Sequence, residues 1–389
     1  MEKRADVVIV GGGIIGVSIA YHLTRQDVRN VVLLERGLLG GGSTGLCAGG
    51  IRTQFASDIN IRFSRESLNF WKHFEEFTGI DLEFRQVGYL FLATQSDTWD
   101  LFQRNVQLQR SYGLPVELLD SQEIHYRWPF LQWDDLLGGT FCPLDGYAGP
   151  HEALTGMARM ARQDGAKIYD QTEVVGFQVK RRRVVGVKTR VGDIETPMVV
   201  NATGPWASVV GKLAGVEIPV KPLRRQVFVT APFNLSEEPT PLVIDFDQGW
   251  YFRQEGKGFL LSGPVDKEPS FRTSIDHGAM AETAEKATIR VPALEEACIT
   301  RGWGGLYEIS PDHHAILGPI SGLEGFILAN GFSGHGFQHS PVVGRNIADF
   351  VVSGKASRDF SALSLERFEL GKTMEEPLTA FKEQISGVS

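Results

Sequence analysis

The sequence predicts a mixed fold, in which an α/β domain with a parallel sheet is interleaved with an α+β domain built on an antiparallel sheet. Two observations carry this prediction: a β-α-β unit surrounds a glycine-rich turn near the N-terminus, and from residue 86 short strands separated by turns take over. With 389 residues, the chain is long enough for two to three domains of about 150 residues. Segments typical of the first domain return in the middle and at the end of the chain.

The N-terminal segment predicts the β-α-β unit. Four consecutive apolar residues, 7–10, are typical of a strand buried on both faces, and residues 30–35 repeat the pattern. Residues 14–25 carry apolar side chains at helical spacing. Between strand and helix, Gly11, Gly13 and Gly16 have the GxGxxG spacing, which allows a tight turn, close approach of backbone to a pyrophosphate, and close helix–sheet packing. The unit therefore predicts a Rossmann-type dinucleotide-binding domain.

Glu35 ends the second predicted strand, where a carboxylate would accept hydrogen bonds from the hydroxyls of an adenosine ribose. An acidic residue there favours a free ribose over the 2′-phosphate of NADP. Because a second fingerprint of this kind is absent, we expect one bound dinucleotide. Glycines in an ordinary tight turn are the alternative.

Further elements follow from periodicity. Residues 57–80 predict a helix that ends near Gly79. The first domain is expected to return as a helix after Pro150, strands near Glu173 and at 199–201, and a strand at 325–330 leading to a helix that begins near Pro341. The basic run 180–183 reads as a hairpin turn. Short runs that predict the antiparallel sheet are residues 87–92, 226–230, 242–246, 249–253 and 259–262.

Three segments rich in glycine or other small residues have the composition to contact a ligand. The loop at 40–50 offers backbone amides and the hydroxyls of Ser43 and Thr44 to a phosphate, with a flexible surface loop as the alternative. Residues 200–206 end a buried strand in small residues. Residues 331–339 precede a helix whose N-terminal amides would face negative charge, such as the edge of a reduced flavin.

Composition and charge exclude several classes of protein. A net charge of −8 and the absence of a broad basic field argue against a nucleic-acid partner. Cys47, Cys142 and Cys298 lie far apart, which predicts neither a disulfide framework nor a zinc site. No run reaches the roughly 20 apolar residues of a membrane helix, and the four apolar residues near the start are too few for a signal peptide. We expect a cytoplasmic protein with no metal site; the adjacent His313 and His314 are interpreted as structural.

Several of these motifs together resemble the FAD-dependent amino-acid oxidase family, in particular its glycine and sarcosine oxidase group. The resemblance covers nearly the whole chain, and the segments GGIRTQF and RQVGYLFL look most like the β subunit of sarcosine oxidase or of dye-linked L-proline dehydrogenase. The quoted segments are GGGIIG with Glu35 and Arg36, STGLCAGGIR, FRQVGYL, NATGPW, SPDHHA and GFSGHGF.

The resemblance implies oxidation of an amine next to a carboxylate, with hydride passing from the α-carbon to flavin N5 and giving an imine. It implies that Arg52 binds the carboxylate, a task for which a forked guanidinium is suited, although a surface salt bridge is the alternative. Tyr251 falls near a tyrosine of the substrate site, with core packing nearly as plausible. His335 matches a histidine beside the flavin, with a capping role as the alternative.

Departures from the family pattern bear on the chemistry. Gln338 stands where a relative has a carboxylate-binding lysine, so an amide would assist Arg52. Leu261 takes the position of a lysine that promotes reaction with oxygen, which makes a dehydrogenase at least as plausible as an oxidase. Gly305 replaces a cysteine that links FAD, so non-covalent FAD is expected. His151 lies close to an FMN-linking histidine of the β subunit, but a plain helix-terminal histidine is the more plausible interpretation; FMN would imply a second subunit.

The resemblance places an FAD-binding domain at 1–85, 145–220 and 305–389 and a substrate-binding domain at 86–144 and 221–304. Expected partners are a small amino-acid or amine substrate and an electron acceptor, either oxygen or a partner redox protein. Two alternatives remain open: a peroxide-forming primary amino-acid oxidase and a non-catalytic flavoprotein that serves as an assembly or interaction partner. Expected catalytic residues are Arg52, Tyr251, His335 and Gln338, and expected cofactor contacts are Gly11, Gly13, Ile14, Ile15, Gly16, Glu35, Arg36, Ser43, Thr44, Gly49, Gly50, Ile51, Val174, Ala202, Thr203, Gly204, Trp206, Gly305, Gly331, Gly334, His335, Gly336, Phe337 and Gln338.

Overall fold

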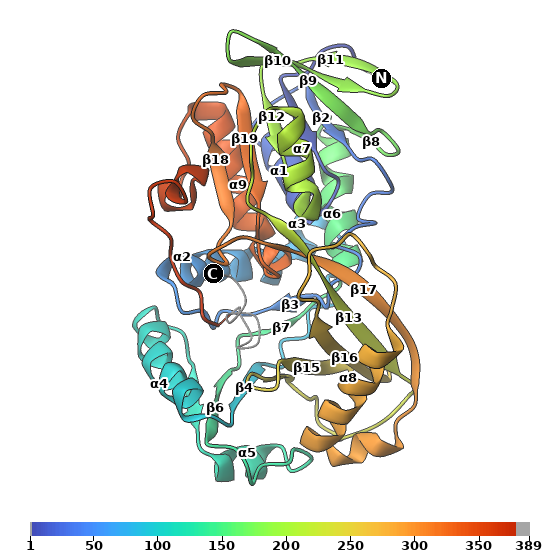
Figure 1. Ribbon diagram of the computed structural model, residues 1–389, viewed down its shortest axis with the longest axis vertical. Coiled ribbons are helices and arrows are strands. Elements are labelled where there is room, and N and C mark those ends of the chain that lie inside the picture. Colours follow the sequence, from blue (N-terminus) through green and yellow to red (C-terminus); the bar gives the residue numbers. More distant parts are fainter. Residues whose placement is uncertain (1, 379–389) are drawn as a thin grey trace.

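The N-terminal apolar run forms the central strand of a six-stranded sheet in the computed structural model, which describes residues 2–378 (Figure 1). All neighbouring strands pair in parallel except β18, which is antiparallel to β19. Val7 and Ile9 point to one core and Val8 and Val10 to another, so both faces of the sheet are buried. In order the strands are β18 (Ile316–Pro319), β19 (Phe326–Asn330), β12 (Val199–Asn201), β1 (Val7–Val10), β2 (Val31–Leu34) and β8 (Lys167–Tyr169).

Helices cover one face of this sheet, and a small sheet with one helix covers the other. On the first face α1 packs against both α6 and α9, and α2 packs against α9. The small sheet includes the hairpin predicted at 180–183, with Arg181 and Arg182 at positive φ. The elements are α1 (Ile14–Thr24), α2 (Asp58–Lys72), α3 (Phe74–Thr78), α6 (Pro150–Gln163) and α9 (Gly336–Ser353), and on the other face β9 (Val174–Lys180), β10 (Arg183–Thr189), β11 (Gly192–Glu195) and α7 (Ala207–Leu213).

An eight-stranded sheet forms the second body, below the first in Figure 1. All but one of its strand pairs are antiparallel, and α4 (Ser96–Ser111), α5 (Ser121–Arg127) and α8 (His277–Arg290) lie around it. A two-stranded ribbon of β3 (Gly50–Ile51) and β7 (Gly146–Tyr147) lies between the bodies. In order the strands are β17 (Ile299–Ile309), β13 (Lys221–Thr230), β16 (Gly258–Val265), β15 (Trp250–Glu255), β14 (Leu242–Asp245), β4 (Tyr89–Ala93), β6 (Gly138–Cys142) and β5 (Glu117–Leu119). The predicted fold class is confirmed.

One strand pair in the large sheet differs from the prediction of a purely antiparallel sheet. Strands β4 and β14 pair in parallel. Only strands joined by short turns are obliged to run antiparallel, and these two are joined by a long path through both bodies.

Two predicted helices also differ in detail. The helix expected over 57–80 is interrupted at His73, where the backbone leaves helical geometry (φ −106°, ψ 14°) and Phe74 turns fully into the core; Gly79 then ends the second piece at φ 65°. Helix α9 begins at Gly336, not near Pro341, which lies inside it. Proline has no N–H to donate to the carbonyl of Phe337, and the hydroxyl of Ser340 donates to that carbonyl instead (2.9 Å).

Candidate active site

A cavity of about 630 Å³ extends from the glycine-rich turn between β1 and α1 to the face of the large sheet. Its volume is in the range of pockets that enclose small ligands. Most of the expected site residues line it. These are Gly11, Gly13, Ile14, Ile15, Glu35, Arg36, Ser43, Thr44, Gly49, Gly50, Arg52, Val174, Ala202, Thr203, Gly204, Trp206, Tyr251, Gly305, Gly334, His335, Gly336, Phe337 and Gln338.

Three of the expected cofactor contacts, Gly16, Ile51 and Gly331, are not among the lining residues of this cavity. Gly16 lies behind the turn, where a Cβ would come 2.0 Å from the carbonyl oxygen of Gly11. Ile51 is buried in β3, and Gly331 donates its amide to Glu308 (2.8 Å). These three residues therefore lie behind the cavity walls, where they pack against the wall residues or orient them.

The glycine-rich turn has the geometry that the GxGxxG spacing predicts. Gly11 has φ 111°, and a Cβ there would lie 2.4 Å from the carbonyl oxygen of Ala202. The backbone just after β12 thus lies so close to the turn that only glycine fits at residue 11. The amide of Ile14, at the start of α1, donates to the hydroxyl of Thr44 (2.9 Å), which brings the 40–50 loop over the helix N-terminus.

Glu35 is held rigidly on the cavity wall at the end of β2. Its carboxylate accepts hydrogen bonds from the amides of Gly12 and Gly37, each 2.7 Å long. Two amide donors fix the carboxylate, and its remaining acceptor capacity is available to ribose hydroxyls. Beside it, the guanidinium of Arg36 lies 3.9 Å above the ring of Trp206.

Arg52 is buried at the other end of the cavity, with 8% of its surface exposed, which rules out the surface salt bridge considered above. Its guanidinium donates to the carbonyl oxygens of Gln54 and Leu378 and lies 3.8 Å above the ring of Phe55. Those two bonds use two of the five N–H donors of an arginine, so the fork retains donors for a carboxylate. Burial lowers the pKa of Arg52, and the charge of Glu376 is the largest opposing influence.

The expected partner of Arg52, Gln338, is tied to its backbone. The side-chain oxygen of Gln338 accepts a hydrogen bond from the Arg52 amide (2.8 Å), and its amide nitrogen faces His339 (3.4 Å). The contact joins the N-terminus of α9 to the residue after β3. Gln338 thus positions Arg52 as well as lining the cavity.

His335 precedes α9 and makes no side-chain capping bond, so the capping alternative does not hold. Neither ring nitrogen has a hydrogen-bond partner within residues 2–378. Burial, and after it the neighbouring His339 and Arg52, lower its pKa well below the usual value, which keeps the imidazole neutral. A buried, unpartnered imidazole on a cavity wall is typical of a group that meets a ligand.

Tyr251 faces the cavity from β15, and sequence reasoning missed the aromatic and cationic groups around it. The Arg225 guanidinium, buried on β13, lies 4.8 Å from the ring centre of Tyr251 and 5.8 Å from that of Tyr307. Tyr89 and Phe91 line the same end from β4. The signal that could have revealed Arg225 is a charged residue beside the apolar run predicted at 226–230.

Glu308 is a second residue that the sequence did not single out. It lines the cavity from the end of β17 and accepts hydrogen bonds from the amides of Gly331 (2.8 Å) and Phe332. Burial raises its pKa from 4.5 to about 8 despite these bonds. In the sequence Glu308 looks like an ordinary polar residue of a strand, because the two amides that bind its carboxylate come from a loop that follows a different strand.

Replacement of Glu308 by glutamine is expected to weaken the pH dependence of stability. In the unfolded chain the carboxyl loses its proton near pH 4.5, whereas in the fold it keeps the proton to about pH 8, so the free energy of unfolding falls as pH rises through this window. Urea midpoints at pH 5.5 and 8.5 should differ less for the variant than for the parent protein. An equal change in both proteins would contradict the raised pKa of Glu308.

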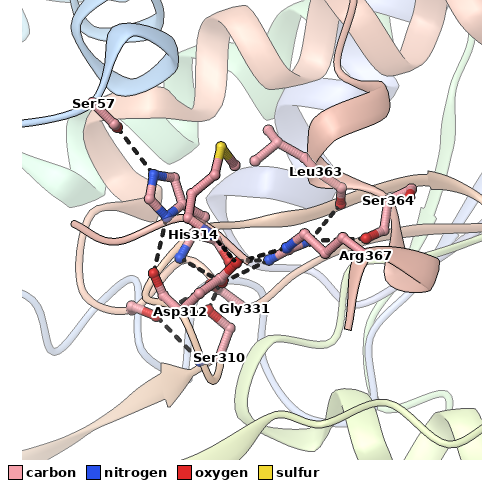
Figure 2. A network of polar contacts seen from close by, with 10 residues as sticks. Ser57, Ser310, Asp312, His314, Gly331, Leu363, Ser364 and Arg367 are labelled. Atoms are coloured by element: carbon pink, nitrogen blue, oxygen red, sulfur yellow. Dashed lines mark hydrogen bonds and ion pairs between the residues drawn. The ribbon is translucent and has the colours of Figure 1, made fainter. Parts of the chain in front are cut away.

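Other expected residues lie elsewhere. His314 bonds through Nε2 to the hydroxyl of Ser57 (3.0 Å) and through Nδ1 to the carbonyl oxygen of Asp312, so its role is structural (Figure 2). No cluster that could hold a metal ion occurs within residues 2–378.

His151 is exposed at the start of α6, outside the cavity. Leu261 packs in the core of the large sheet, also outside the cavity, so this position carries no argument about oxygen.

Comparisons with known proteins agree with this geometry. A profile of the DAO family, described as FAD dependent oxidoreductase, matches residues 6–350. Mitochondrial sarcosine dehydrogenase of Homo sapiens is 31% identical over 386 residues, which cover 95% of this chain but 42% of that protein; the chain thus spans less than half of that relative. L-proline dehydrogenase from P. horikoshii has a TM-score of 0.91 and 34% identity, covering 96% of this chain and all of that one. Glycine oxidase from Geobacillus kaustophilus has a TM-score of 0.85 and 27% identity, covering 94% and 99%.

Proposed function

Because the chain belongs to the DAO family of FAD-dependent oxidoreductases, we propose that it oxidises the C–N bond of a small amino acid or N-alkyl amino acid of the sarcosine, proline or glycine type, giving an imine. The observation that carries the proposal is the buried guanidinium of Arg52, which faces the cavity whose other end is the glycine-rich turn. A buried cation at the end of a pocket is suited to a ligand with a carboxylate. The dehydrogenases and the oxidase that resemble the chain carry names of such substrates.

The residues of the cavity fit FAD. Gly13, just before α1, leaves room for a pyrophosphate at the N-terminus of that helix, Glu35 presents a fixed carboxylate to a ribose, and the N-terminus of α9 faces the cavity at Gly336. Gly305 has no side chain to form a bond to the flavin, and burial raises the pKa of the nearby Cys47 thiol to about 11, so FAD is held non-covalently. Bound FAD supplies the acceptor for the hydride of the substrate.

The side chains of this chain would bind and orient the substrate. Arg52 holds the carboxylate, and Tyr251, Tyr307 and Tyr89 close the surrounding wall. The buried charges of Arg52 and Arg225 disfavour a protonated amine beside them, so the amine is held in its neutral, reactive form. Because His335 is neutral, the amides at the N-terminus of α9 are left to stabilise negative charge on a ligand there.

The finer assignments belong to the same proposal. We place the domain boundaries as expected above, although β17 runs continuously through residue 305. No described helix is long and apolar enough to cross a membrane. A cytoplasmic location and an electron acceptor that is either oxygen or a partner redox protein are part of the proposal. FMN at His151 is not, because this exposed side chain lies outside the cavity.

An anaerobic visible spectrum tests the proposed function. The purified protein, loaded with FAD, is titrated in turn with sarcosine, dimethylglycine, glycine and both enantiomers of proline. We expect one of them to bleach the flavin, because the cavity joins a carboxylate anchor to the cofactor site. Admission of air then distinguishes oxidase from dehydrogenase by the rate at which colour returns.

Two results would count against the proposal. A yellow protein that none of these amines bleaches would favour another substrate class or the non-catalytic flavoprotein. A colourless protein that takes up no added FAD would contradict the cofactor assignment itself.

A further inference from the structure

The C-terminal segment, residues 361–378, returns from the six-stranded sheet to the end of the cavity where Arg52 lies. It leaves the first body after α9, forms two short 3-10 turns, η3 (Ser361–Leu363) and η4 (Leu365–Arg367), and then runs without regular structure to Leu378. Leu378 lines the cavity with its side chain 6% exposed. A segment far from the glycine-rich turn in sequence thus contributes to the wall of the site.

A buried ion pair anchors the start of this segment (Figure 2). Arg367 donates two hydrogen bonds of 2.8 Å to the carboxylate of Asp312, and both side chains are at most 3% exposed. Arg367 also donates to the carbonyl oxygen of Leu363 (2.7 Å), which ties the segment to itself. Replacing either partner alone would leave an uncompensated buried charge, so the position of the segment depends on both residues of this pair.

A second anchor lies two residues before Leu378. The carboxylate of Glu376 accepts hydrogen bonds from the amide of Ala56 (2.7 Å), the hydroxyl of Ser57 (2.6 Å) and the side-chain amide of Asn60 (2.9 Å). These donors belong to the start of α2 and the residues just before it, a few positions after Arg52. Glu376 therefore fixes the end of the segment against the part of the chain that carries Arg52.

Leu378 contacts Arg52 directly. Its carbonyl oxygen accepts a hydrogen bond from Nη2 of Arg52 (3.1 Å), and its side chain packs in one cluster with Phe91, Leu242 and Ile244 of the large sheet. The same three side chains line the cavity. A branched apolar side chain therefore stands beside the group that would hold the substrate carboxylate.

We propose that Leu378 is a specificity-determining residue, whose side chain limits the size of the Cα substituent of the substrate and whose carbonyl orients Arg52. The inference rests on the proposed function, in which Arg52 binds the carboxylate. A carboxylate on Arg52 would lie next to Leu378, and the Cα, one bond away from it, would bring its substituent within reach of the Leu378 side chain. A leucine there leaves room for glycine-like or small Cα groups and disfavours branched ones.

The Leu378→Ala variant tests the proposal with two readouts. In turnover, the ratio of kcat/KM for racemic N-methylleucine to kcat/KM for sarcosine should rise at least tenfold over the parent protein. In binding, flavin absorbance titrations with acetate and 4-methylpentanoate measure the two Kd values. The Kd of acetate divided by the Kd of 4-methylpentanoate should also rise at least tenfold over the parent protein. The binding readout needs no reaction, so it remains decisive even if no amine reduces the flavin and the proposed function fails.

Leu370→Ala is the matched control, because Leu370 lies in the same segment with 64% of its surface exposed. It should leave both ratios unchanged. FAD content and Tm identify any variant that has lost its fold. Glu376→Gln weakens the second anchor and should raise the Kd of acetate and 4-methylpentanoate alike. If Leu378→Ala folds, binds FAD and keeps the parent ratios in both readouts, Leu378 does not limit the substrate.

Discussion

Replacement of Arg52 by alanine is expected to raise the KM of a carboxylate substrate about 10- to 150-fold while the protein keeps its FAD. A hydrogen bond to a charged group contributes about 1.5–3 kcal/mol, which corresponds to that range of binding constants. Arg52 lies at the far end of the cavity from Gly11 and Glu35, so the cofactor contacts should survive its loss. Steady-state kinetics, with FAD content measured from the absorbance, check the result.

Arg52→Lys separates the charge of Arg52 from its geometry. Lysine keeps the positive charge beside Glu376 but lacks the planar fork that meets both oxygens of a carboxylate. We expect a KM between those of the parent protein and Arg52→Ala. If both variants keep the parent KM with a full content of FAD, Arg52 serves only to tie the carbonyls of Gln54 and Leu378 together.

The fold could be predicted because its signals are local. The apolar run of β1, the glycines of the turn and the spacing of α1 lie within a short stretch, and each dictates its own backbone geometry. The end of β2 then places Glu35 next to that turn without any knowledge of the rest of the chain. The break at His73 escaped prediction, since the helical periodicity continues through it and Phe74 is buried as an unbroken helix would also have it.

The substrate end of the cavity could be predicted only in part. Arg52 and Tyr251 came from a family resemblance, and the structure brings both to the cavity. Glu308 and Leu378 carry no local signal. The first is bound by a loop that follows another strand, and the second is carried to the cavity by a segment that the Asp312–Arg367 pair anchors. Such positions depend on long-range packing, which periodicity and spacing do not report.

Gly16→Ala is expected to weaken FAD binding more than tenfold and to lower Tm, although alanine favours a helix over glycine by about 1 kcal/mol. Gly16 lies in the first turn of α1, and its added Cβ would stand 2.0 Å from the carbonyl oxygen of Gly11, so the turn must move. Gly11 in turn lines the cavity and has the carbonyl of Ala202 against it, which leaves little room for that movement. Quenching of flavin fluorescence on binding to the apoprotein measures the affinity.

Two further glycines make the comparison decisive. Gly278→Ala adds the same methyl group to the first turn of α8, where the nearest atom is a carboxylate oxygen of the exposed N-cap residue Asp276 at 3.2 Å, so helix propensity should dominate and Tm should hold or rise. Gly13→Ala meets only the Thr44 hydroxyl of the protein, also at 3.2 Å, and should keep the fold and Tm, while its methyl group enters the cavity and weakens FAD binding directly. If Gly16→Ala raised Tm and bound FAD like the parent, packing behind the turn would not limit the cofactor site, and the glycine would be there for reasons other than close approach.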